Sequence, residues 1–156
     1  MKVPQLVRAG LVTGVIDAVF SSVLVRFFYG STVTRLWQGV ASVPLGPEAF
    51  NGGSRTAFIG LAIHFGVAFA WATVFLILLR LGPVRRAVSS AGGLLGVAAM
   101  FGPIVWITMS MLVIPSMTHR PPTINFRWWV QLFGHIPFVA LPIVATLAKH
   151  DVDHRH

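Results

Sequence analysis

Four apolar stretches, each long enough to cross a lipid bilayer, constrain the fold of this chain more than any other feature. They lie at about 6–29, 56–80, 87–117 and 128–148 in a chain of 156 residues. A hydrocarbon core about 30 Å thick is crossed by about 20 apolar residues in a helix. Only 10% of the residues are charged, too few to cover a soluble domain of this size with polar surface. The sequence therefore predicts an all-α, integral membrane four-helix bundle that forms a single transmembrane domain over residues 1–156.

The link between the first and second spans carries a further helical pattern at about 33–44. Its apolar residues recur at helical spacing: Leu36, Trp37, Val40 and Val43. We expect a short amphipathic helix that lies on the membrane surface or dips into it. The following PEAFNGG is typical of a turn. It either ends this helix, which we favour, or forms a lid over the membrane interior.

Charge and cysteine content narrow the functional classes. The net charge is +8 and there is no cysteine, which excludes disulfides, thiolate metal sites and cysteine nucleophiles. The basic residues are scattered at the ends of apolar runs, where they would contact anionic headgroups, so we expect a lipid bilayer and no nucleic acid as partner. Four spans place both termini on one side, and the excess of basic residues there favours the cytoplasm. The tail 149–156 is polar, and we expect it to be solvated.

Three ionisable residues interrupt the apolar spans: Asp17, His64 and His135. A charged residue at a helix centre costs about 2.5–3.5 kcal/mol on insertion scales, so each needs a partner. Each lies eight or nine residues from an arginine that ends its span on the same side of the membrane: Arg26, Arg55 and Arg127. At 1.5 Å per residue all three lie about 12–14 Å below that interface. The third span places Ser110 and Met111 at this level, which predicts an intramembrane polar layer.

Small residues mark the helix faces that we expect to pack closely. Gly10 and Gly14 share a stripe with Asp17 in the first span, and Gly92 and Gly96 form a similar face in the third. Such spacing lets another helix approach. The polar residues Gln38, Glu48 and Asn51 are the candidates for a link or lid beside the layer.

Several functions are compatible with the polar layer. His64 and His135 could be the axial ligands of a b-type haem. The same histidines with Asp17 and Met111 could bind copper or zinc. The three ionisable groups could relay protons or form part of a solute pathway. They could also form a hydrogen-bonded network that fixes helix register.

No hydrolase or nucleotide-binding motif accompanies them, so we expect no cofactor and favour a protein that is not an enzyme over one that is. The leading hypothesis is a non-enzymatic accessory or scaffold subunit that packs against other membrane proteins or against copies of itself. The alternative is a redox or transport protein that uses the Asp17, His64 and His135 layer.

Four blocks of the sequence carry a resemblance to a family: LWQGVASVPLGPEAFNGG, GLAIHFGVAF, MSMLVIPSM and GHIPFVALPI. In order and spacing they resemble a family of small, uncharacterised four-span bacterial inner-membrane proteins. The third block departs from the family's usual MNYVVLPLS, whose asparagine would fall near Ser110. The resemblance implies a four-span architecture in a bacterial inner membrane and no established activity.

Overall fold

The computed structural model describes residues 3–153, and the side chains of residues 3–148. Within this part of the chain the structure is helical and contains no strand, which confirms the all-α prediction. Four helical stretches are long and apolar enough to cross a membrane: Val3–Phe28, Gly53–Leu78, Ala91–Thr118 and Phe126–Ala148. They correspond to the four spans expected from the sequence.

Three of the four spans change helical geometry along their length. The first consists of α1 (Val3–Val23) and a π-helical segment, Leu24–Phe28. The third consists of α5 (Ala91–Ile107), a π-helical segment Thr108–Val113 and α6 (Ile114–Thr118). The fourth consists of α7 (Phe126–His135), a π-helical segment Ile136–Ala140 and α8 (Leu141–Asp153). The second span, α3 (Gly53–Leu78), is a continuous α-helix.

The connections contain helices of their own. The first link holds α2 (Val33–Leu45) and a 3₁₀ turn, Pro47–Asn51. The link between the second and third spans holds α4 (Gly82–Ala87). Ser90 then caps the next helix by accepting a hydrogen bond from the Gly93 amide at 3.1 Å, a favoured N-cap arrangement. The third span therefore begins at Ala91, and the predicted start at residue 87 was wrong by one helical turn.

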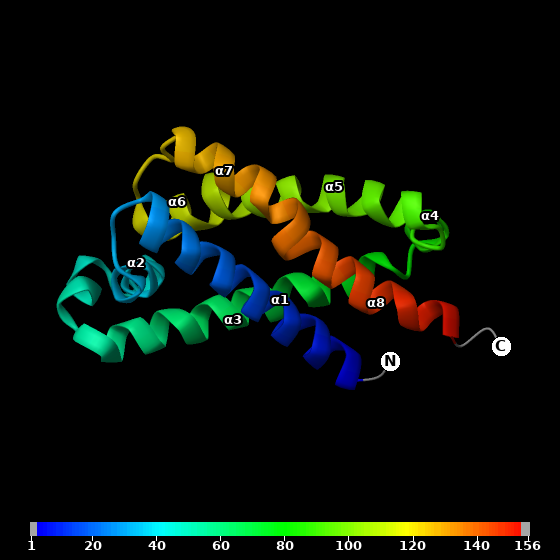
Figure 1. The fold of residues 1–156 in the computed structure, drawn as a ribbon, viewed down its shortest axis with the longest axis horizontal. Coiled ribbons are helices and arrows are strands. Elements are labelled where there is room, and N and C mark those ends of the chain that lie inside the picture. The colour runs from blue at the N-terminus through cyan, green and yellow to red at the C-terminus, as the bar shows by residue number, and fades with distance from the viewer. Residues whose placement is uncertain (1–2, 154–156) are drawn as a thin grey trace.

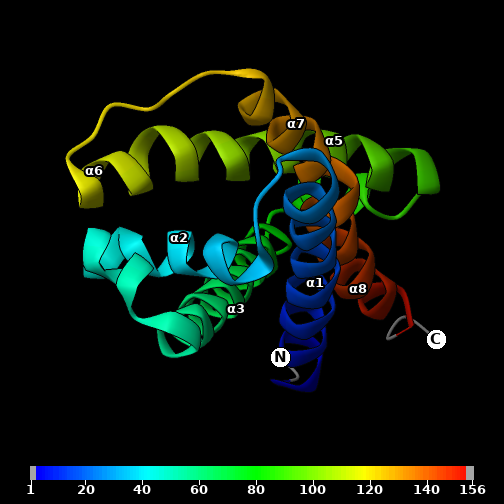
Figure 2. The ribbon, with the colours of Figure 1, turned by 60° about the vertical axis from the view of Figure 1, so that its left-hand side comes forward.

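The helices spread apart at one end of the molecule. In Figure 1, α3 and α5 are connected through α4 at one end and separate toward the other, where α2 lies between α3 and α6. Figure 2 shows the same placement of α2 from a second direction. The start of α1 and the end of α8 lie at the same end as α4. Helix α1 packs against α3 and α8, and α5 packs against α7 and α8.

The hydrophobic core lies toward the α4 end. It is made of buried side chains mainly from α3, α5 and α8, with Phe75, Phe101, Ile143, Val144 and Leu147 among the larger ones. The ring centroids of Phe75 and Phe101 lie 5.1 Å apart, which joins the second span to the third. The core thus connects the helices on the side away from α2.

A very close crossing positions α2 on α3. A Cβ atom at Gly60 would lie 1.8 Å from the backbone oxygen of Trp37, so only glycine permits this approach. The Gln38 side chain is buried and donates from Nε2 to the Gly53 carbonyl oxygen at 3.0 Å. Helix α2 covers the predicted range 33–44 and is packed along the second span rather than separate from it.

Candidate functional site

Asp17 and His64 face each other where α1 packs on α3. The distance from His64 Nδ1 to Asp17 Oδ2 is 3.8 Å, and each side chain is 14% exposed. The other ring nitrogen of His64, Nε2, lies 3.0 Å from the Gly14 carbonyl oxygen. Both nitrogens of His64 therefore face oxygen atoms of α1.

Two glycines allow this contact. A Cβ atom at Gly10 would lie 2.3 Å from the ring of Phe69, and one at Gly14 would lie 2.4 Å from the ring of Phe65. The predicted small-residue face of the first span is therefore occupied by aromatic rings of α3. This packing brings the Gly14 carbonyl within reach of His64.

The arrangement specifies how many protons the pair holds. A carbonyl oxygen only accepts hydrogen bonds, so His64 Nε2 must carry a proton and donate it to Gly14. In a neutral imidazole, Nδ1 then presents a lone pair toward Asp17. If Asp17 were also ionised, two lone pairs would face each other and the pair would carry a net negative charge in an apolar region. One additional proton, on Nδ1 or on the carboxylate, makes the pair neutral and complementary.

His135 approaches Asp17 from a different helix and is held more tightly. It is buried, and its Nδ1 donates to the Gln131 carbonyl oxygen at 2.7 Å. A Cβ atom at Gly102 would lie 2.8 Å from the His135 backbone, so α5 and α7 cross closely there. Asp17, His64 and His135 thus come from three helices, α1, α3 and α7, and are called the polar cluster below.

Tryptophan side chains connect this cluster to Ser110. The ring of Trp106 lies 4.9 Å from the ring of His135, centroid to centroid, and 6.4 Å from that of Trp128. Trp128 Nε1 donates to Ser110 Oγ at 3.0 Å. Met111 is half-buried on the same π-helical segment as Ser110. The third and fourth spans are therefore joined by a polar contact at the level where the sequence placed Ser110.

Some polar atoms of the cluster have no internal partner. Among the described residues, Thr13 Oγ1, Asp17 Oδ1 and Trp106 Nε1 are buried without a hydrogen bond. Thr13 lies one helical turn before Asp17 on α1. Buried polar groups in folded proteins are almost always satisfied, so these atoms are exceptions among the described residues.

The same geometry bears on the haem and metal hypotheses. His135 Nε2 is the ring nitrogen left after Nδ1 has bonded to the Gln131 carbonyl, as in many metal-binding histidines. His64 differs, because Gly14 and Asp17 engage both of its nitrogens. Within the described part of the chain, no three His, Cys, Asp or Glu side chains gather as a metal site. The haem and metal hypotheses therefore stay predictions.

The residues assigned to a link or lid do not contact the cluster. Asn51 donates from Nδ2 to Glu48 Oε2 at 3.0 Å, and both are exposed. Gln38 instead attaches α2 to the start of α3. The link residue beside the cluster is Trp37, whose ring lies 5.1 Å from that of His64.

Sequence reasoning missed three aromatic residues of the site. Trp37 was assigned to an apolar helix face, Trp128 was not assigned to the layer, and Trp106 was given no role. Their contacts cross from one helix to another, and no spacing along the chain reports such contacts. The one available signal is that a tryptophan inside a span needs a partner for its N–H group.

Comparisons with known proteins give no family for this chain. No family model matches it, and no curated protein or solved structure shows a match. The resemblance to small four-span bacterial proteins therefore stays a prediction and contributes no activity.

Proposed function

We propose that this chain is a multi-pass membrane protein that binds and transfers a proton at the Asp17–His64 pair. The supporting observation is that His64 faces the Gly14 carbonyl with one nitrogen and the Asp17 carboxylate with the other. This geometry is complementary only when the pair holds one proton more than an ionised aspartate and a neutral histidine. The pair is the coupling or relay site of a transport protein.

The transfer step needs no other reactant, but His64 Nδ1 and Asp17 Oδ2, 3.8 Å apart, must first approach to hydrogen-bond distance. Protonated Asp17 with neutral His64 interconverts with ionised Asp17 and imidazolium when the proton moves from Oδ2 to Nδ1. Neither form adds net charge to the apolar region, which keeps the electrostatic cost of transfer low.

Partial exposure of the pair supports exchange with the surroundings. Both side chains are 14% exposed, whereas His135 is among the buried polar residues. A structural ion pair that only fixed helix register would be expected to have all its atoms satisfied, yet Asp17 Oδ1 has no partner.

As expected from the sequence, we place the protein in a bacterial inner membrane with both termini in the cytoplasm.

A proton-flux measurement tests this function. The full chain is reconstituted into liposomes that contain a pH-sensitive dye, and a potassium diffusion potential drives proton entry. We expect acidification faster than in protein-free vesicles. Asp17→Asn and His64→Asn should lower the protein-dependent rate at least tenfold, because each removes one of the two proton-holding atoms.

Matched variants outside the cluster serve as controls. Glu48→Gln and His119→Asn change an exposed carboxylate and an exposed histidine, and we expect them to retain the wild-type rate. Equal flux in wild type and in folded Asp17→Asn would show that the pair does not carry the proton.

A scaffold or accessory role is the second candidate, and one observation favours it. Gly92 and Gly96 are exposed on α5, and a Cβ atom at either would meet nothing within 4 Å. Among the described residues, nothing packs against this face at Gly92 or Gly96, unlike at Gly10 and Gly14, and the face suits another subunit or a second copy. Gly96→Leu should then abolish a cross-linked oligomer that Gly66→Leu, at an equally open position, preserves. Unchanged cross-linking in Gly96→Leu would remove this support.

A further inference from the structure

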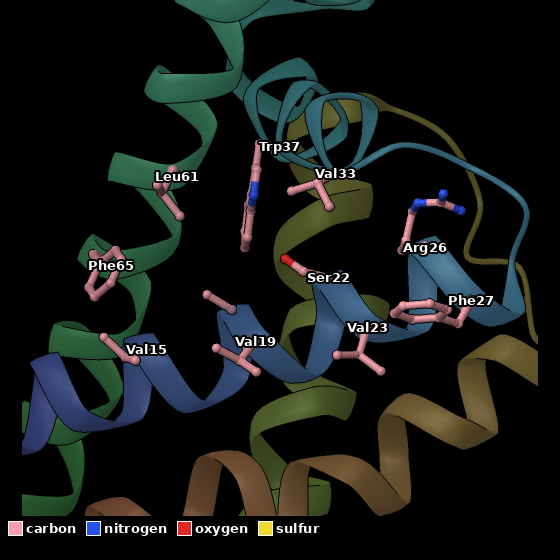
Figure 3. A pocket seen from close by; sticks show the side chains of 11 residues that line it. Val15, Val19, Ser22, Val23, Arg26, Phe27, Val33, Trp37, Leu61 and Phe65 are labelled. Carbon is pink, nitrogen blue, oxygen red and sulfur yellow. The ribbon is translucent and has the colours of Figure 1, made fainter.

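A groove opens on the side of the molecule between α1, α2 and α3. Its volume is about 520 Å³, within the roughly 300–1,000 Å³ range of small-molecule sites. Figure 3 shows α1 contributing Val15, Val19 and Val23 along its length, with Trp37 reaching down from α2 and Phe65 from α3. The three valines are exposed, so the groove faces the lipid rather than the core.

The length of the groove matches one leaflet of a membrane. Its α1 side runs from Val15 to Phe27, which is about 18 Å at 1.5 Å per residue. Half of a hydrocarbon core is about 15 Å. The groove therefore extends from the end of the first span to about the middle of the bilayer.

Polar character is confined to part of the lining. Arg26 lies at the span end, and Ser22 is the other polar side chain among the lining residues. The Arg26 guanidinium lies 5.8 Å from the ring centroid of Phe27, and Figure 3 shows it at the end of the groove away from Phe65. A cation at the interface followed by an apolar channel is complementary to an anionic headgroup and its chain.

We propose that this groove is a binding site for one anionic phospholipid. One acyl chain lies along Val15, Val19 and Val23, beneath Trp37, and the phosphate contacts Arg26. The groove borders the Asp17–His64 pair through Trp37 and Phe65, but neither Asp17 nor His64 lines it, so lipid binding and proton transfer can be tested separately. It identifies phosphatidylglycerol-like lipids as a specific partner of the chain.

Native mass spectrometry of the full chain tests the site. The protein is released from detergent in the presence of equal amounts of phosphatidylglycerol and phosphatidylcholine, and retained lipid is counted. We expect one retained lipid with a preference for phosphatidylglycerol. Arg26→Gln should reduce that preference at least fivefold, while Arg8→Gln, at the opposite end of α1, should not.

A second pair of variants tests the channel. Val19→Trp fills the groove and should reduce retention of both lipids at least fivefold. Val7→Trp makes the same change at an exposed α1 position that does not line the groove, and it should retain lipid normally. Val23→Trp replaces Val19→Trp if the latter lowers the melting temperature.

Three results would contradict the proposed lipid site. Equal retention in Val19→Trp and Val7→Trp would overturn the acyl-chain site. An equal effect of Arg26→Gln and Arg8→Gln would overturn the headgroup contact. A dimer that retains no lipid and dissociates in Val19→Trp would show that a second copy occupies the groove, and it would also overturn the proposal.

Discussion

The first two spans and the fourth span are buried to very different extents. In the most apolar stretch of the first span, only 17% of the residues are buried, and the share is the same in the second span. In the fourth span, 44% of the residues of this stretch are buried. The fourth span supplies Ile143, Val144 and Leu147 to the core. The first span presents Val15, Val19 and Val23 to the outside. The core, which combines residues of the fourth span with inner residues of α3 such as Phe75, is therefore a packed region, and the rest of the first two spans is a thin region facing lipid.

The ionisable residues are divided between these two regions. His135 lies in the packed region, held by its bond to Gln131 and by the close crossing at Gly102. Asp17 and His64 lie in the thin region, beside aromatic rings of α3 and Trp37 of α2. Local movement requires few buried contacts. The comparison indicates that the surroundings of the Asp17–His64 pair can move more readily than those of His135.

We expect the largest difference between the packed region and the thin region when a large apolar side chain is truncated to alanine. Ile143→Ala should lower the free energy of unfolding by about 2–5 kcal/mol, because Ile143 is 0% exposed and its neighbours close the cavity only in part. Ile77→Ala, at a position on α3 that is 55% exposed, should change it by less than about 0.5 kcal/mol. Denaturant titration in detergent measures both. Similar losses would mean that the first two spans are as tightly packed as the fourth.

A smaller effect comes from adding a methyl group at the helix crossings. Gly102→Ala places a Cβ against the His135 backbone and should cost about 1–3 kcal/mol, as overpacking does. Gly14→Ala meets the ring of Phe65, which lines the groove and can move into it, so we expect less than half that cost. Gly66→Ala, which meets nothing within 4 Å, is the matched control. A larger cost at Gly14 than at Gly102 would reverse the comparison.

The smallest effect is the coupling between Asp17 and His64. Asp17→Leu and His64→Leu should be non-additive in unfolding free energy by about 1 kcal/mol, because each single change leaves the other polar group unpaired. The corresponding cycle between Asp17 and His135 should give a smaller coupling, since no hydrogen bond or short ion pair joins them among the described contacts. Additive effects for the first pair would mean that Asp17 and His64 do not interact.

Much of the architecture follows from the sequence because membrane insertion depends on composition over about 20 residues. Apolar runs located four spans, and the recurrence of Leu36, Trp37, Val40 and Val43 located α2. Counting from Arg26, Arg55 and Arg127 predicts one depth for three ionisable groups, because an α-helix advances by a constant rise per residue, and this common depth stays a prediction. The boundary at Ala91 was less accurate, since a short helix and an N-cap intervene.

Tertiary structure decided which of these groups meet. Nothing along the chain relates Trp37 to His64, Trp128 to Ser110, or Phe65 to Gly14. Helix periodicity tells which residues share a face of one helix, but rotation and crossing angle between helices depend on how whole side-chain surfaces fit together. The sequence by itself determined a four-span helical chain with three polar positions. The packing alone decided that Asp17 pairs with His64, that His135 is held separately, and that a lipid-facing groove ends at Arg26.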